Sequence, residues 1–93
     1  MKKHLLVAGC QFPVEADIRS NCDHILSQIE RAAEQGARII HFSETALSGY
    51  AGVDFPDISQ LDWDQLKTAT EEILAAAADR QVWVLLGSTH RLT

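Results

Sequence analysis

One carboxylate stands out among the residues that could do chemistry. Glu44 directly follows the apolar segment 39–42, whereas the other twelve carboxylates fall in helical patterns, at helix caps or in polar loops. Phe42, Leu47 and Tyr50 flank it, so we expect partial desolvation, which raises the pKa of a carboxyl group toward neutrality and suits a general base. The glutamate could instead hydrogen-bond backbone N–H groups of its own loop, and the residue taken by itself favours that structural role.

The other polar and aromatic residues carry weaker signals. Cys10 and Cys22 lie in no C-x-x-C or metal-ligand spacing, and we expect reduced thiols that pack in the interior. The histidines show no metal spacing and the serines lack a G-x-S-x-G elbow, so the sequence predicts no metal or cofactor site. Tyr50 could line a substrate pocket or brace its loop, whereas Phe55 is better explained by bracing. The tryptophans, Trp63 and Trp83, are typical of core or interface anchors.

Composition excludes several classes of protein. The chain has 93 residues, 8 Lys and Arg against 13 Asp and Glu, a net charge of −5 and a hydrophobic share of 46%. These values are typical of one small folded domain. Its few basic residues are scattered, which argues against nucleic acid as a partner. No apolar stretch approaches the ~18–20 residues of a membrane span, so we expect no membrane partner and a cytoplasmic location.

The elements that must position Glu44 alternate along the chain. Continuous apolar runs predict three buried parallel strands: 5–10, 39–42 and 82–86. The first intervening helix is predicted from an apolar stripe that starts at Ile18, with Asp17 as its N-cap and Gly36 as its C-cap glycine. The sequence therefore predicts an α/β fold.

The second intervening helix follows a cap at Asp62 or Asp64 and closes at residues 79–80. Its predicted buried stripe contains five residues: Leu66, Ala69, Ile73, Leu74 and Ala77. The full order is β-α-β-α-β.

Two connections at the carboxyl ends of the strands are long. Residues 11–16 follow the first strand, and residues 44–61 follow the second. The second exceeds the ~4–6 residues usual in compact domains, and open α/β sheets bind ligands at this edge. Two helices cannot cover both faces of three apolar strands if their crossovers lie on one side. We therefore interpret residues 1–93 as a single partial domain completed by more polypeptide or by a partner chain, and we expect a homo-oligomer.

Several short segments occur in a fixed order with characteristic spacings: 7–14, 17–18 with Asn21, 32–33, 36–40, 42–44, 47–50 and 84–88. This set resembles the start of the nitrilase-type carbon–nitrogen hydrolases and spans nearly the whole chain. One departure is Ser43, because the position before the glutamate is often proline in that family. This difference should change how the backbone enters the loop more than it changes the chemistry of the loop.

The resemblance implies an α-β-β-α sandwich, of which residues 1–93 would be the amino-terminal portion, and a Glu–Lys–Cys triad. The cysteine would attack a small amide, nitrile or carbamoyl compound, the lysine would stabilise the oxyanion, and Glu44 would act as general base. The family's lysine and cysteine lie well beyond its third strand, so we expect them after Thr93. Cys10 and Lys67 do not match them, and the isolated chain is expected to be inactive.

A second function stays open from the sequence. The chain could be a noncatalytic α/β module that binds a ligand or subunit at its strand ends and is completed by self-association. The reading frame after Thr93 separates the two hypotheses. A continuation with a lysine and then a cysteine, each after a strand, supports the enzyme, and a stop codon favours the module.

Overall fold

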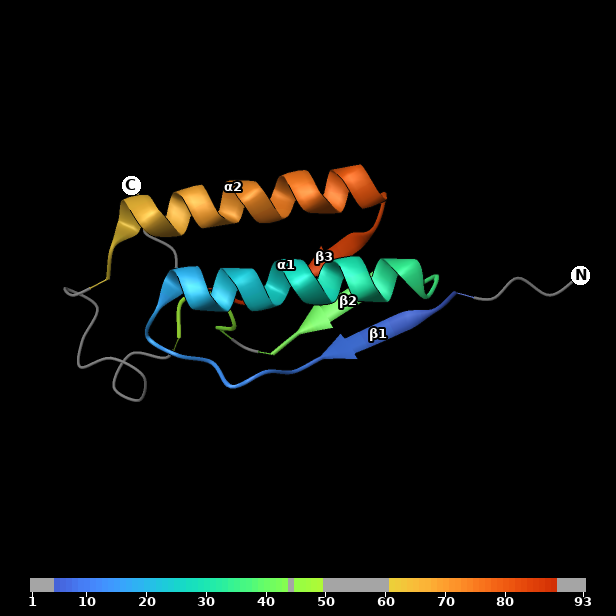
Figure 1. Ribbon diagram of the computed structural model, residues 1–93, viewed down its shortest axis with the longest axis horizontal. Helices are drawn as coiled ribbons and strands as arrows, with labels where there is room; N and C mark the ends of the chain where they lie inside the picture. Colours follow the sequence, from blue (N-terminus) through green and yellow to red (C-terminus); the bar gives the residue numbers. More distant parts are fainter. Residues whose placement is uncertain (1–4, 44, 50–60, 89–93) are drawn as a thin grey trace, which may run out of the picture.

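A three-stranded parallel sheet with two helices on one side forms the framework of the molecule (Figure 1). The computed structural model describes residues 5–43, 45–49 and 61–88. The elements follow in the order β1 (Val7–Cys10), α1 (Ile18–Glu34), β2 (Ile39–Phe42), α2 (Trp63–Arg80) and β3 (Trp83–Leu85). In the sheet the strands have the same order, β1-β2-β3, and both pairs are parallel. The predicted α/β class and element order are confirmed.

Helix α1 begins and ends at the predicted residues. The Asp17 side chain accepts hydrogen bonds from the backbone N–H groups of Arg19 at 3.0 Å and Ser20 at 3.3 Å, which satisfies donors that the first turn leaves unpaired. After the last turn Gly36 has a φ of 91°, a left-handed conformation that costs glycine little. Five residues of the predicted stripe are buried, and Leu26 and Ala33, which widen it, are partly buried. The buried residues are Ile18, Cys22, Ile25, Ile29 and Ala32.

Helix α2 differs from the prediction at two residues of its stripe, because Ala77 is only partly buried and Leu74 is exposed. Asp62, rather than Asp64, is its N-cap, and its carboxylate accepts a 2.9 Å hydrogen bond from the backbone N–H of Gln65. The buried stripe consists of Leu66, Ala69 and Ile73. Leu74 was predicted on this stripe, but it is 63% exposed. It lies about 100° around the helix from Ile73, which turns it from α1 toward the outer edge of β3.

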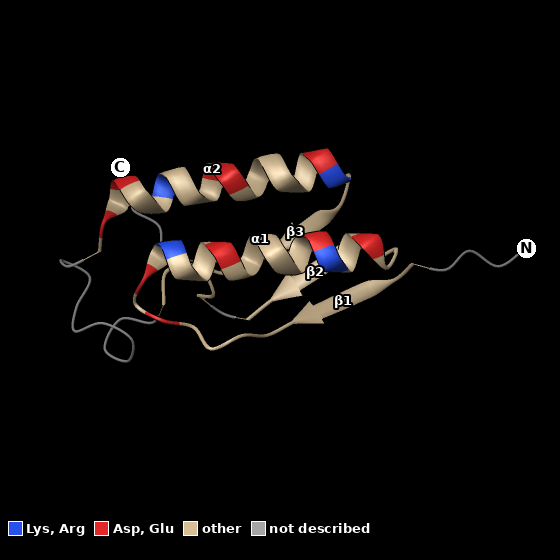
Figure 2. Cartoon of the chain, viewed as in Figure 1, with Lys and Arg blue, Asp and Glu red and all other residues tan. Residues whose placement is uncertain are grey.

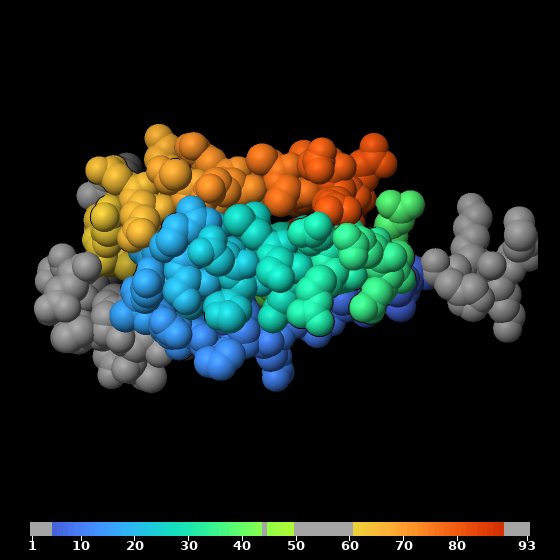
Figure 3. Space-filling model, viewed as in Figure 1, coloured from blue at the N-terminus to red at the C-terminus, as the bar shows by residue number. Residues whose placement is uncertain are grey.

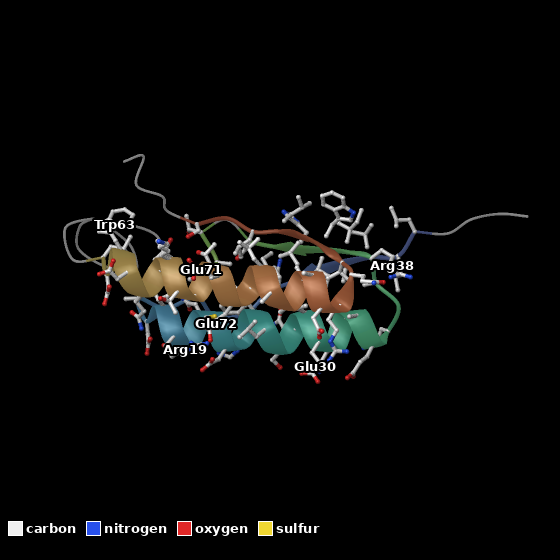
Figure 4. The ribbon with its side chains drawn as sticks, turned by 90° about the horizontal axis from the view of Figure 1, so that it is seen from above. Arg19, Glu30, Arg38, Trp63, Glu71 and Glu72 are labelled. Atoms are coloured by element: carbon white, nitrogen blue, oxygen red, sulfur yellow. The ribbon has the colours of Figure 1, made fainter. Side chains whose placement is uncertain are left out.

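The two helices lie side by side over the same face of the sheet (Figures 1 and 3). Their buried stripes meet the inward side chains of β2, Ile40 and Phe42, which are 0% and 2% exposed. Ion pairs join the helices at their surface: Arg19 Nη1 lies 2.7 Å from Glu72 Oε2, and Arg80 lies 3.3 Å from Glu30. Figure 4 shows Arg19 and Glu72 facing each other across the two helices, with Glu30 toward the other end of α1. The hydrophobic core therefore lies between one face of the sheet and the helices.

The opposite face of the sheet is not covered by any described residue. We call it the open face, and it consists of six strand positions: Val7, Gly9, Ile39, His41, Trp83 and Leu85. Val7, Trp83 and Leu85 are 54%, 76% and 54% exposed. Parallel sheets in α/β proteins have both faces covered. The structure thus has the one-sided cover that the sequence predicts when both crossovers lie on the same side.

Neither α1 nor α2 has the combination of length and apolar composition needed to cross a lipid bilayer, and these are the helices of the described segments.

Candidate functional site

The carboxyl ends of the strands meet at one edge of the sheet. A hollow of about 290 Å³ lies there, between the ends of β1 and β2. Its lining residues are Gly9, Cys10, Gln11, His41, Phe42 and Ser43. Glu44, the predicted general base, comes directly after this lining in the chain. Glu44 itself, Tyr50 and Phe55 lie outside the described residues, so their roles stay predictions.

The segment that follows Glu44 is a buried turn. Ala46, Leu47 and Ser48 are each 0% exposed. The N–H of Ala46 donates to the carbonyl of Ser43 at 3.2 Å, and the N–H of Gly49 donates to the carbonyl of Thr45 at 2.8 Å. The chain is therefore fixed on both sides of position 44, by the end of β2 before it and by the turn after it.

Thr45 has an unusual backbone conformation. Its φ is 51°, in the left-handed region that a β-branched residue rarely adopts. Such conformations cost free energy and persist where the surroundings hold them, and they concentrate at functional sites. The unusual backbone at Thr45 supports a functional role for the segment next to Glu44.

Asn21 on α1 joins two of the loops at this edge. Its side-chain Nδ2 donates to the carbonyls of Glu15 at 2.7 Å and Leu47 at 2.9 Å, and its Oδ1 accepts from the N–H of Glu15 at 2.9 Å. The side chain is 0% exposed, and these bonds account for both of its polar atoms. Asn21 thereby holds the loop after β1 against the turn after Glu44.

The same turn also reaches the segment after β3. The N–H of Leu47 points to the carbonyl of Gly87 at 3.5 Å, a long hydrogen bond. Through Asn21 and Leu47, all three loops at the carboxyl edge of the sheet are connected. In the sequence, Asn21 was recognised only as part of a family pattern, and its role in joining the loops was missed. The available signal was its position, because a polar residue sits on the apolar stripe between Ile18 and Cys22.

The two cysteines are packing residues rather than activated nucleophiles. Burial raises the pKa of the Cys10 thiol, which packs against the core from the end of β1. Burial is also the main reason that the pKa of Cys22 rises to about 11, with Arg19 opposing the shift and Glu72 adding to it. A reactive cysteine needs a lowered pKa, because the thiolate is the nucleophile. The positions of both thiols agree with their predicted packing role.

Three further polar side chains of the described residues are exposed. Lys67 is exposed on α2, and His41 is in β2 on the open face, at the rim of the hollow. His24 is exposed on α1, where its ring stacks on Phe12 at a centroid distance of 5.0 Å. Within residues 5–43, 45–49 and 61–88, no three His, Cys, Asp or Glu side chains are arranged to hold a metal ion.

Comparison with known proteins identifies similar chains. A family model described as carbon–nitrogen hydrolase matches residues 6–92. The chain resembles the crystal structure of an amidase from Nesterenkonia sp., with 28% identity and a TM-score of 0.72 over 92% of this chain and 34% of that one. No curated protein matches.

A variant of the amidase from Nesterenkonia sp. AN1, in which glutamine replaces a glutamate, is equally similar in fold. It has 27% identity and a TM-score of 0.72 over 92% of this chain and 35% of that one. That structure shows the result of Michael addition of acrylamide at the active-site cysteine. The present chain thus spans about a third of the length of the amidase chains that it matches.

Proposed function

The chain belongs to the carbon–nitrogen hydrolase family, and from that premise we propose that it supplies the general base of an enzyme that hydrolyses a small non-peptide amide. The same site chemistry would serve a nitrile or a carbamoyl compound. The amide is the preferred class because the similar solved structures are amidases. Glu44 is the proposed base, and Tyr50 is the proposed substrate contact.

In the proposed reaction Glu44 accepts the proton of a cysteine thiol as the sulfur attacks the amide carbon. The carbonyl oxygen becomes an oxyanion, which a lysine ammonium stabilises. The C–N bond then breaks, the proton passes to the departing nitrogen, and a thioester remains. Water, deprotonated by Glu44, hydrolyses this thioester and frees the thiol. The lysine and the cysteine of this scheme lie outside the 93 residues.

One observation carries the proposal: within the stretch that matches the family, the chain on both sides of Glu44 is held in place. A general base must stay within hydrogen-bond reach of the proton it removes. The end of β2, the buried turn and the Asn21 side chain fix the residues on either side of Glu44, which supports this role.

The 93-residue chain by itself is expected to have no amidase turnover. The pKa values of Cys10 and Cys22 are raised, and Lys67 lies on the outer surface of α2. Incubation with acrylamide or propionamide, followed by ammonia detection, tests this expectation. Turnover that Glu44→Gln or Cys10→Ala abolishes would contradict it.

The decisive experiment uses the reading frame that contains this sequence, expressed together with the residues encoded after Thr93. If these include the lysine and the cysteine, Glu44→Gln should lower kcat/KM for a simple amide by about 10²–10⁴-fold, the usual contribution of a general base. The matched control is Glu34→Gln, a substitution at an exposed glutamate near the end of α1, which should leave kcat/KM unchanged. Equal activity of the two variants would refute the role of Glu44.

A noncatalytic module completed by self-association is the second candidate, and the uncovered apolar strand positions favour it. A reading frame that stops at Thr93 would support this candidate over the enzyme.

A further inference from the structure

We propose that Asn21 is a positioning residue for the proposed amide hydrolysis, because its side chain holds the turn next to Glu44 in a backbone conformation that Thr45 does not favour by itself. This role rests on the function proposed for Glu44 and adds a second residue to the same site. Asn21 would act through the backbone of the turn and would not touch the substrate, since its side chain is 0% exposed.

The backbone of Thr45 is the feature that needs an explanation. The N–H of Ala46 donates to the carbonyl of Ser43, which closes a turn with Thr45 as its third residue. The φ of 51° lies in the left-handed region, where glycine or asparagine is usual. A β-branched residue in this conformation raises the local free energy, so the turn would relax unless other contacts held it.

The contact that can hold this turn comes from α1. Asn21 Nδ2 donates at 2.9 Å to the carbonyl of Leu47, two residues after Thr45. The same amide group exchanges hydrogen bonds of 2.7 and 2.9 Å with the backbone of Glu15, which fix its orientation. Leu47 is 0% exposed, so loss of the amide donor would leave its carbonyl unpaired and away from water. The turn would then have to move to find a new partner.

Other contacts of the turn restrain Thr45 less. The bond from the N–H of Leu47 to the carbonyl of Gly87 is 3.5 Å long, beyond the usual ~2.7–3.2 Å. Residues 45–49 contain no Lys, Arg, Asp or Glu, whereas charged residues lie along both helices (Figure 2). An ion pair therefore cannot tie this stretch to α1. Burial of the turn is non-directional and does not by itself select a φ at Thr45.

A displacement of the turn would reach Glu44 directly, because Glu44 precedes Thr45 in the chain. A general base must stay within hydrogen-bond reach of its proton, and a shift of about 1 Å can cost ~10²-fold in rate. We therefore expect Asn21→Ala to lower kcat by about 10- to 100-fold. KM should change by less than about threefold, since Asn21 contributes no contact to substrate binding.

The test uses the full reading frame that contains this sequence, including the residues encoded after Thr93, with a simple amide as substrate. The matched control is Ile29→Ala, a truncation on the same helix at a residue that is 1% exposed. Ile29 lies about 12 Å along the helix axis from Asn21, and its truncation lowers stability without removing a bond to the turn. Its kcat should stay within about threefold of the wild type. Equal losses of kcat in the two variants would reduce the role of Asn21 to general stability and overturn the proposal.

Thr45→Gly supplies a readout that a merely structural role of Asn21 would not move. Glycine adopts the left-handed conformation without the steric cost, so the turn should depend less on Asn21. In the Thr45→Gly background, Asn21→Ala should lower kcat by less than about threefold. A loss as large as in the Thr45 background would contradict the proposed link between the two residues.

Two further measurements cover the case in which Asn21→Ala fails to fold. Asn21→Asp keeps the side-chain oxygen and loses the amide donor, so its kcat should fall in the same way. Amide hydrogen exchange does not depend on turnover: the N–H groups of Ala46 and Gly49 should exchange at least about tenfold faster in the Asn21 variant than in Ile29→Ala, because the turn opens locally. Equal exchange rates would refute the role of Asn21. Far-UV circular dichroism verifies that each variant is folded.

Glu44→Gln separates this role from the proposed function. If Glu44→Gln is inactive and Asn21→Ala keeps the full kcat, Glu44 remains the base and Asn21 does not position it. If Glu44→Gln keeps the full kcat, the proposed function is wrong and the positioning role of Asn21 is wrong with it.

Discussion

At the scale of single residues, the buried Asn21 side chain connects the loops of the candidate site. Its three side-chain hydrogen bonds connect α1, the loop after β1 and the turn after Glu44. Because the amide is buried, its removal leaves backbone groups of both loops without partners. Such unpaired buried groups cost more than the bonds themselves contribute.

Asn21→Ala is therefore expected to lower the free energy of unfolding by about 3 kcal/mol. Urea unfolding followed by circular dichroism at 1 μM protein measures the change. Ser27→Ala, an exposed substitution on the same helix, should change it by less than about 0.5 kcal/mol. Equal stability of the two variants would show that the Asn21 side chain does not hold the loops.

Ionisation of the Cys22 thiol should lower the stability of the folded protein at alkaline pH. Its pKa is raised to about 11 in the folded chain, mainly by burial, so folding favours the protonated thiol. The resulting stability is fully present below the pKa of the unfolded thiol, near 8.5–9, and is lost as pH rises through the folded value.

We expect the Cys22 thiol to account for about 2 kcal/mol of lost unfolding free energy between pH 9 and pH 11. Urea unfolding at several pH values measures the slope. Lysines and tyrosine also titrate in this range, so the comparison is with Cys22→Ala, which should have the shallower slope. Parallel slopes for the wild type and this variant would rule out the Cys22 contribution.

Sequence reasoning identified residues whose role is local and missed residues whose role depends on distant contacts. Asp17 and Gly36 were predicted because a cap is specified by its place at the end of a periodic pattern. The bond of Asn21 to Leu47 joins residues 26 positions apart, which no local pattern contains. The left-handed Thr45 was missed because threonine gives no signal for that conformation.

At the scale of the elements, apolar packing rather than ion pairing holds α1 to α2. The buried stripes of the two helices face each other, and the ion pairs lie at the surface beside them. In the Arg80–Glu30 pair the side chains are 36% and 58% exposed. Pairs exposed to this degree contribute little, since water and salt screen them.

Adjacent substitutions on α1 test this ranking. Ile29→Ala, at a residue that is 1% exposed, should cost about 2–5 kcal/mol of unfolding free energy. Glu30→Gln, which weakens the ion pair, should cost less than about 1 kcal/mol. Denaturant titration of both variants gives the comparison. A larger effect at Glu30 would mean that the ion pair dominates.

The order of strands and helices could be predicted from the sequence, but which side of α2 is buried could not. Strand and helix order followed from continuous apolar runs alternating with helical periodicity, and the structure confirms it. The prediction failed at Leu74 because the second half of α2 contains four consecutive alanines, residues 75–78, which give no directional signal. With apolar residues all around the helix, the sequence pattern does not reveal which side faces α1.

At the scale of the whole molecule, the second candidate function, a module completed by self-association, would link stability to protein concentration. A ligand that binds the folded state raises its apparent stability, and a second copy acts in the same way. Under that candidate, the Tm of the chain should rise with protein concentration between 1 and 500 μM. For Val7→Lys, by contrast, Tm should stay constant. Differential scanning calorimetry measures both, and a concentration-independent Tm in the wild type would contradict the association.

That one face of the sheet is uncovered could be predicted by counting helices and strands. The residues that make up this face could not be predicted in the same way. Continuous apolar strands implied cover on both faces, and two helices were too few to supply it. Side chains alternate between the two faces of a strand, and a continuous apolar run does not reveal which alternate set points away from the helices. The placement of His41 on that side among apolar neighbours therefore required the coordinates.

The unreversed strand order has a consequence for where a substrate can sit. Many open α/β sheets bind ligands where two neighbouring loops run to opposite faces of the sheet. This happens where the strand order changes direction. Here the order runs β1-β2-β3 with both helices on one side (Figure 1), so these strands create no such divergence. A substrate cavity would therefore need residues from outside these three strands to form its other side. It would then lie between two layers of secondary structure rather than within one sheet.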